Sequence, residues 1–197
     1  MLDEKHRARE VTLGASRSTI QCSAASIRAT QRGEYARAEE LAAEAAAHLA
    51  RADEAVAGHL DVRHGGYLHD AKKEYAEARI TLAFVRGDAL PMPDALGVEP
   101  PAYLNGLAEA ASELRRHILD CLRADRLERA EVLLATMDDV YALLVTVDYP
   151  DAITGGLRRT TDALRAVIER TRGDLTNALV AARLRNAIER ADDDGRR

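Results

Sequence analysis

The segment LAAEAAAHLA, residues 41–50, contains six alanines in ten positions. Alanine has the highest intrinsic helix propensity of all residues, and its small side chain lets two helices approach each other closely. Aromatic residues make up only 4% of the chain and tryptophan is absent, so alanine and leucine must supply most of the packing. This stretch therefore predicts an all-α protein whose helices pack through small side chains.

The rest of the chain follows the same helical pattern, and no segment has the strict apolar–polar alternation of a half-buried strand. Four of the five prolines fall within LPMPDALGVEPP, residues 90–101, which predicts a loop. Gly33, Gly87 and Gly173 are predicted helix ends, and Asp174 is a predicted cap of the last helix. Short connections predict antiparallel neighbours, as in helical bundles. Seven helices are expected, at 3–32, 34–60, 64–86, 101–123, 126–147, 151–172 and 174–192, in one domain over 1–192 with a flexible tail at 193–197.

The 197 residues carry a net charge of −5, which argues against a simple nucleic-acid coat. The charge is unevenly distributed: residues 1–33 and 156–190 are basic, whereas 34–61 is acidic. This asymmetry permits an anionic partner on one surface without requiring one. No apolar run is long enough for a membrane span. Cys22 and Cys121 fall in helical patterns and are expected to be buried, inert thiols of a cytoplasmic protein.

Two pairs of glutamates stand out on consecutive long helices. Glu74 and Glu77 lie in DAKKEYAEARI (70–80), and Glu109 and Glu113 lie in YLNGLAEAASELRRHILD (103–120). If these two helices pack antiparallel against each other, the two pairs converge across a groove. Two carboxylates about 6 Å apart repel by roughly 3 kcal/mol at an effective dielectric constant of about 20, so the four need protons, arginines or a divalent cation. Oxygen ligands of this kind suit Mg²⁺ or Mn²⁺.

Other interpretations of the same residues stay open. Acidic pairs at these spacings also arise on solvated helix faces in a chain with 33 acidic residues. A ferritin-like di-iron site requires Glu-x-x-His on two helices, and no glutamate here has a histidine at that spacing. All-α nucleotide pyrophosphatases also use a Glu-x-x-Glu pair and a later acidic pair, although the second pair is usually spaced by three residues rather than four.

Several segments together resemble the translin family. EYAEA (74–78), followed after a proline-containing loop by YLNGLAEAASELRR (103–116), is similar to the catalytic branch, translin-associated protein X (Trax), and to its archaeal relatives. QRGE (31–34) and DYPDAITGGLRR (148–159) also resemble archaeal members. The similarity extends over nearly the whole chain. The residues ASEL (111–114) also occur in translin proper, which is non-catalytic, so the chain combines features of both branches.

The resemblance implies an all-α translin fold, assembly into a homo-oligomeric octamer, binding of single-stranded RNA or DNA, and a Mg²⁺-dependent endoribonuclease site. Glu74 and Glu77 match the two glutamates of the Trax motif, and Glu113 matches a third. Glu109 stands where Trax has aspartate, and the side chain, longer by one methylene, shifts a bound metal enough to weaken catalysis. A non-catalytic, translin-like binder of RNA or single-stranded DNA is the alternative, and a nucleotide pyrophosphatase is a third possibility.

Arginines are the expected contacts to nucleic acid, because guanidinium groups bind phosphate in bidentate geometry. Arg17 and Arg28 are eleven residues apart and therefore lie on one helix face. With few aromatic side chains for base stacking, binding is expected to be salt-sensitive and weakly sequence-specific. His64 and His69 precede Glu74 and are either phosphate contacts, proton carriers or ordinary surface histidines. The candidate contacts are Arg17, Arg28, Arg32, Arg158, Arg159, Arg165 and Arg172.

Overall fold

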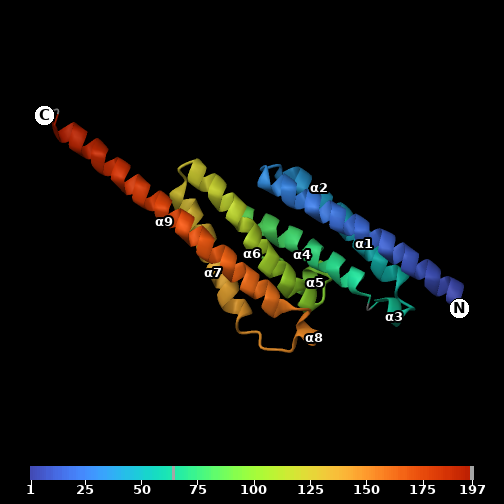
Figure 1. Ribbon diagram of the computed structural model, residues 1–197. Coiled ribbons are helices and arrows are strands. Elements are labelled where there is room, and N and C mark those ends of the chain that lie inside the picture. Colours follow the sequence, from blue (N-terminus) through green and yellow to red (C-terminus); the bar gives the residue numbers. More distant parts are fainter. Residues whose placement is uncertain (64, 196–197) are drawn as a thin grey trace.

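The computed structural model describes residues 1–63 and 65–195, which form helices and connecting loops without a β-strand. This confirms the predicted all-α class. Within these described ranges, six long helices build the body and three single-turn helices lie in the connections (Figure 1). The helices are α1 (Leu2–Gln31), α2 (Tyr35–Ala55), α3 (Leu60–Arg63), α4 (Gly66–Arg86), α5 (Pro93–Leu96), α6 (Pro100–Arg123), α7 (Leu127–Leu144), α8 (Asp151–Thr154) and α9 (Leu157–Gly195).

The long helices α1, α4, α6 and α9 run in one direction, and α2 and α7 run in the other. Lys72 near the start of α4 pairs with Glu99 just before α6, and Arg129 at the start of α7 reaches the last carbonyls of α4. The prediction that α4 and α6 are antiparallel is therefore wrong. The proline-rich connection 87–99 is long enough to return along the bundle, so α6 starts beside the start of α4.

The α1–α2 pair packs through small residues, as the alanine-rich segment predicted. Ala38, Ala42 and Ala45 of α2 are fully buried. The buried face of α1 carries short hydroxyl side chains, and one of them bonds directly to α2: Ser26 donates to the carbonyl of Ala38 at 2.8 Å. Such short side chains let the two helix backbones lie close together.

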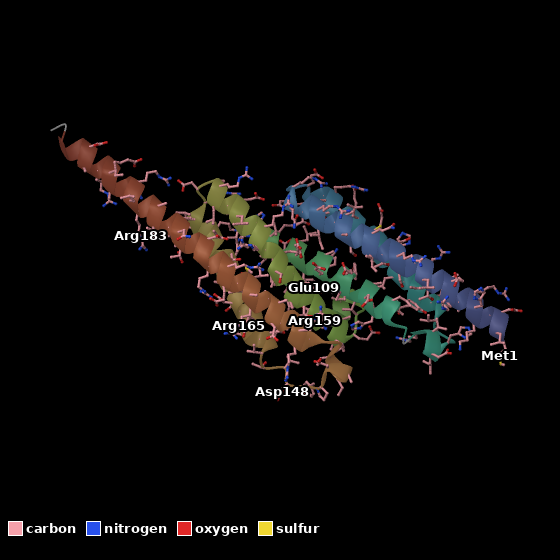
Figure 2. All side chains as sticks on the ribbon, viewed as in Figure 1. Met1, Glu109, Asp148, Arg159, Arg165 and Arg183 are labelled. Atoms are coloured by element: carbon pink, nitrogen blue, oxygen red, sulfur yellow. The ribbon has the colours of Figure 1, made fainter. Side chains whose placement is uncertain are left out.

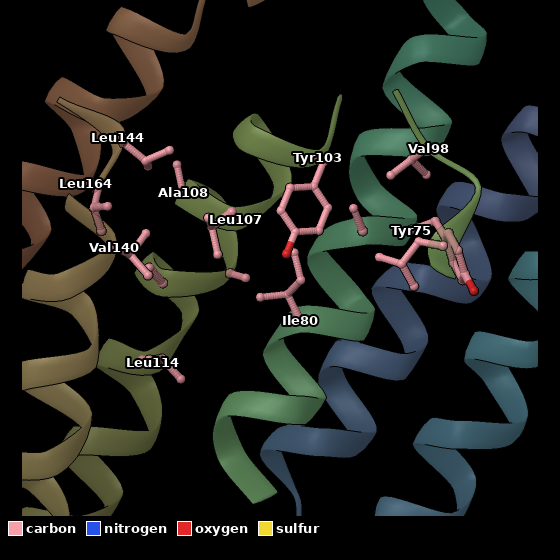
Figure 3. Packing of buried hydrophobic residues seen from close by; sticks show 14 of the residues in the cluster. Tyr75, Ile80, Val98, Tyr103, Leu107, Ala108, Leu114, Val140, Leu144 and Leu164 are labelled. Carbon is pink, nitrogen blue, oxygen red and sulfur yellow. The ribbon is translucent and has the colours of Figure 1, made fainter. Parts of the chain in front are cut away.

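The main core lies between α4, α6, α7 and α9 (Figure 3). Apolar residues of α6 at helical spacing face it, and Leu107, Leu114 and Ile118 are almost completely buried. Tyr103 occupies the α4 side of α6, where its hydroxyl donates to the carbonyl of Pro91 at 2.9 Å. Because α6 is covered on both sides, it is the central helix, and a polar side chain on it lies near several other helices.

Two of the three predicted glycine helix ends are confirmed. Gly33 and Gly87 adopt a left-handed backbone conformation, with φ of +77° in both. The third is wrong, because α9 continues without interruption through Gly173 for 39 residues. Asp174 does not cap a helix; it forms an ion pair with Arg115 of α6 at 2.8 Å. Tertiary contacts on both sides of Gly173 outweigh its low helix propensity.

The carboxyl-terminal part of α9 extends beyond the other helices (Figure 1). Of the predicted flexible tail, residues 193–195 belong to α9, and 196–197 lie outside the described residues, as does His64. None of the helices over 1–63 and 65–195 has the length and apolarity that a bilayer crossing requires. Both cysteines are free thiols; Cys121 is buried and Cys22 is half-buried.

Candidate metal centre and adjoining groove

Three of the four predicted glutamates meet between α4 and α6. Glu74, Glu77 and Glu109 each offer a carboxylate oxygen, and these oxygens lie within 4.8 Å of one another. We call these three residues the carboxylate cluster. Glu113, the fourth, lies one turn further along α6 and accepts a hydrogen bond from Gln31 of α1. It is therefore beside the carboxylate cluster rather than part of it.

Gly106 makes the close approach of α4 and α6 possible, one turn before Glu109. A Cβ atom at this position would lie 2.8 Å from the carbonyl oxygen of Lys73 and 3.0 Å from the backbone nitrogen of Glu77. The α4 backbone thus occupies the space of a side chain on α6. Only glycine allows the two helices to bring their glutamates to this separation.

The carboxylate cluster is electrostatically unbalanced. Glu77 is only 8% exposed, and burial, followed by repulsion from the neighbouring carboxylates, raises its pKa from 4.5 to about 9. Burial also raises the pKa of Glu113, against the opposing effects of Arg116 and Gln31. At neutral pH the carboxylate cluster therefore holds a proton that a cation would displace.

Lys73 is the one cation in direct contact with the carboxylate cluster among the described residues. Its Nζ lies 2.7 Å from Glu109 and 3.3 Å from Glu74. Burial lowers the pKa of Lys73, but these two ion pairs outweigh burial and leave the pKa raised. Lys73 was not among the residues predicted from the sequence. Its position four residues before Glu77, on the same helix face, was the available signal.

Glu74, Glu77 and Glu113 line a groove of about 840 Å³ between α1, α4 and α6. We call it the arginine groove, because four arginines line it: Arg28, Arg115, Arg116 and Arg123. Arg115 and Arg123 are engaged in ion pairs with aspartates. Arg28 and Arg116 are exposed and make no ion pair with a described residue. Two guanidinium groups therefore remain available to an anion in the groove.

The predicted nucleic-acid contacts are dispersed. Arg28 lines the arginine groove, whereas Arg32 and Arg172 are paired with Glu34 and Asp138, each at 2.7 Å. Figure 2 shows Arg159 beside Glu109 at the start of α9, with Arg165 further along that helix.

The remaining arginines lie elsewhere. Arg17 and Arg165 are exposed on α1 and α9, and neither lines the arginine groove. Arg158 faces a separate pocket at the end of α7. Arg115 and Arg116, which stand two and three residues after Glu113, were not among the predicted contacts. Their place in ELRR, next to an acidic pair, was the available signal.

The donors of the carboxylate cluster fit a hard divalent cation. Three carboxylates from two rigid helices converge, the ammonium of Lys73 compensates part of their charge, and Glu77 is held towards its neutral form. Oxygen-only donors with no cysteine or histidine in the set suit Mg²⁺ or Mn²⁺ rather than Zn²⁺. The ammonium has to give way when a cation binds all three carboxylates.

Comparison with known proteins gives one similar sequence and several similar structures, whereas no protein-family model matches the chain. An uncharacterized protein of Methanocaldococcus jannaschii is 32% identical over 127 residues, which are 64% of this chain and 56% of that protein. The chain thus spans little more than half the length of this curated relative.

Solved structures give fuller matches. The complex of the Archaeoglobus C3PO with duplex RNA is 33% identical, with a TM-score of 0.80 over 91% of this chain and 93% of that one. A crystal structure of the Archaeoglobus C3PO is 32% identical, with a TM-score of 0.79 over 91% of this chain and 94% of that one. The Nematostella C3PO, at 19% identity and a TM-score of 0.80 over 90% and 95%, shares the fold. These C3PO structures are of the translin and Trax type, and this chain belongs to the translin family.

Proposed function

We propose that this protein binds RNA and cleaves its phosphodiester bonds with a divalent cation, Mg²⁺ or Mn²⁺, held by Glu74, Glu77 and Glu109. The observation that carries the proposal is the carboxylate cluster at the wall of a groove with two arginines that pair with no acid among the described residues. The similarity to the Archaeoglobus C3PO, whose structure was solved with duplex RNA, supports RNA as the ligand.

Each residue has a proposed role that follows from its position. Arg28 and Arg116 bind phosphate groups of the strand and hold it along the arginine groove. Glu113 is held by the hydrogen bond from Gln31 and borders the same groove. It orients the part of the RNA strand that lies beside the carboxylate cluster. When bound, the cation supplies a nucleophile by lowering the pKa of water and neutralises charge on the phosphate. Gly106 keeps the donors of α4 and α6 close enough to share one ion.

Cleavage of a labelled single-stranded RNA, measured with Mg²⁺ and then with EDTA, tests the proposal. We expect cleavage that EDTA abolishes, and loss of cleavage with retained RNA binding in Glu77→Gln. Glu131→Gln is the matched control, because Glu131 is exposed on α7 away from the groove. Cleavage that persists unchanged in Glu77→Gln refutes the site assignment.

The second candidate is a non-catalytic, translin-like binder of RNA or single-stranded DNA. The ion pairs of Lys73 favour it, because its ammonium already neutralises Glu74 and Glu109. On this alternative the RNA is bound intact both with Mg²⁺ and with EDTA. The variant Lys73→Met distinguishes the nuclease from the non-catalytic binder. Removal of the competing ammonium strengthens cation binding only if the carboxylate cluster is a metal site.

We include in the same proposal that the protein assembles into a homo-oligomer, an octamer as the resemblance to the translin family implies. Val180, Leu184 and Ile188 are more than half exposed and stand at four-residue spacing on the projecting part of α9. An apolar stripe of this kind on a free helix favours burial against another chain. Light scattering coupled to size-exclusion chromatography gives the mass, and Leu184→Glu is expected to lower it.

A further inference from the structure

A second hollow, of about 470 Å³, lies on the other side of the carboxylate cluster. It is bounded by α4, α6 and the α8–α9 turn with the start of α9, and we call it the α9 hollow. Lys73 and Glu109 form part of its wall, and Ser112 lines both the α9 hollow and the arginine groove. The carboxylate cluster is therefore accessible from two sides: Glu74 and Glu77 face one, and Glu109 faces the other.

The α9 hollow contains basic groups without acidic partners. Arg159 is exposed at its edge, and neither Arg159 nor the half-buried His69 makes an ion pair or side-chain hydrogen bond with a described residue. The charge of Glu109 is matched by Lys73. The remaining acid, Asp70, is exposed at the rim, where a carboxylate can accept a hydrogen bond from a ribose hydroxyl. This set suits a nucleotide, with its phosphate at the arginine.

The wall of the α9 hollow is held rigidly by Asn105, which is 2% exposed. Its amide nitrogen donates to the carbonyls of Thr154 at 2.8 Å and Pro101 at 2.9 Å. Its amide oxygen accepts from the hydroxyl of Thr160 at 2.7 Å. The contacts to Thr154 and Thr160 tie the end of α8 and the start of α9 to α6, whereas Pro101 belongs to α6 itself. The backbone at Arg159, one residue before Thr160, is therefore held in place.

Gly155 fixes the position of the imidazole in the same wall. It has a φ of +62°, and a Cβ atom there would lie 3.0 Å from the Nε2 of His69. The turn therefore needs glycine for its backbone conformation and also for the space that the histidine ring occupies. His69 is held at the hollow rather than directed freely into solvent.

We propose that the α9 hollow is a nucleotide subsite, so that an RNA strand crosses the carboxylate cluster with one flank in the arginine groove and the other in the α9 hollow. This inference rests on the proposed function. A phosphodiester joins two nucleosides, so a strand whose reacting phosphate lies at the carboxylate cluster must continue in both directions. Arg159 binds a phosphate on one side of the reacting bond, and Arg116 binds one on the other.

Binding in EDTA tests the subsite independently of cleavage. The affinity for a 12-nucleotide single-stranded RNA is measured for the wild-type protein, Arg159→Gln and Arg183→Gln. Arg183 is the matched control, an exposed arginine on the same helix but far from Glu109 (Figure 2). Loss of one phosphate contact is expected to weaken binding about three- to tenfold in Arg159→Gln and to reduce the salt slope by about one. Equal affinities of the two variants would overturn the subsite.

The pattern of cleavage in Mg²⁺ tests which flank each hollow holds. When a bond near one end of the RNA is cleaved, too few nucleotides remain on that side to fill the α9 hollow. At that end only, Arg159→Gln should therefore slow cleavage of terminal bonds less than cleavage of internal bonds. Arg116→Gln should do the same at the opposite end. Effects at the same end would refute the two-sided path. If wild-type protein binds no RNA, both proposals fail; if it binds RNA without cleaving it and Arg159→Gln still weakens binding, only the nuclease proposal fails.

Discussion

Replacement of Glu77 by glutamine should stabilise the metal-free protein at pH 8. Glu77 has a pKa of about 9 in the folded chain, against an ordinary value of 4.5. A carboxyl whose pKa is raised on folding binds more protons in the folded state, so its contribution to stability is complete below about 4.5 and is lost as the pH rises towards 9. Glutamine resembles the protonated acid and removes this dependence.

The size of the effect follows from the shift in pKa. Between pH 5 and pH 8 the free energy of unfolding would fall by at most about 4 kcal/mol, at 1.36 kcal/mol per pH unit. Glu77 borders the arginine groove, and water that enters the groove screens the ionised form. We therefore expect about 1–2 kcal/mol of stabilisation in Glu77→Gln at pH 8, equivalent to a rise in Tm of about 3–8 °C.

Thermal unfolding followed by circular dichroism in EDTA, at pH 5 and pH 8, measures this difference. Wild type and Glu77→Gln should agree at pH 5 and diverge at pH 8, while Glu131→Gln should follow the wild type at both. Added Mg²⁺ should raise the Tm of the wild type more than that of Glu77→Gln, because a ligand stabilises only the folded state that binds it. A lower Tm for Glu77→Gln at pH 8 in EDTA would refute the reasoning.

Three further substitutions test the packing around the site. Gly106→Ala places a Cβ 2.8 Å from the carbonyl oxygen of Lys73, so it should destabilise the protein by about 1–3 kcal/mol and weaken the Mg²⁺-induced rise in Tm; an unchanged Tm would contradict the close crossing. Gly173→Ala meets no atom within 4 Å inside a continuous helix, so denaturant unfolding should show a gain of about 0.5–1 kcal/mol, whereas a loss would indicate a helix end there. Arg129→Gln removes donors to the carbonyls of Phe84 and Val85 at 3.3 and 2.8 Å, and urea unfolding should show a loss of about 1–2 kcal/mol.

The local structure of this protein was predictable because it depends on neighbouring residues. Alanine-rich segments determine helices through intrinsic propensity, and Gly33 and Gly87 end helices because glycine adopts a left-handed conformation at little cost. The acidic pair Glu74 and Glu77 was also recognisable from spacing and from its similarity to Trax. Gly173 has the same local signal as the other two glycines, but there the contacts of α9 with α6 decide, and the helix continues.

Tertiary structure decided the features that depend on the path of the chain. The connection 87–99 reverses direction, so α4 and α6 are parallel, and Glu109 meets Glu74 and Glu77 while Glu113 does not. The same packing buries Glu77 and raises its pKa, which no spacing along a helix determines. It also brings Lys73 to the carboxylate cluster and Arg159 to its far side, 50 residues after Glu109 in the chain. Helix formation is local, but charge, burial and convergence depend on which helices become neighbours.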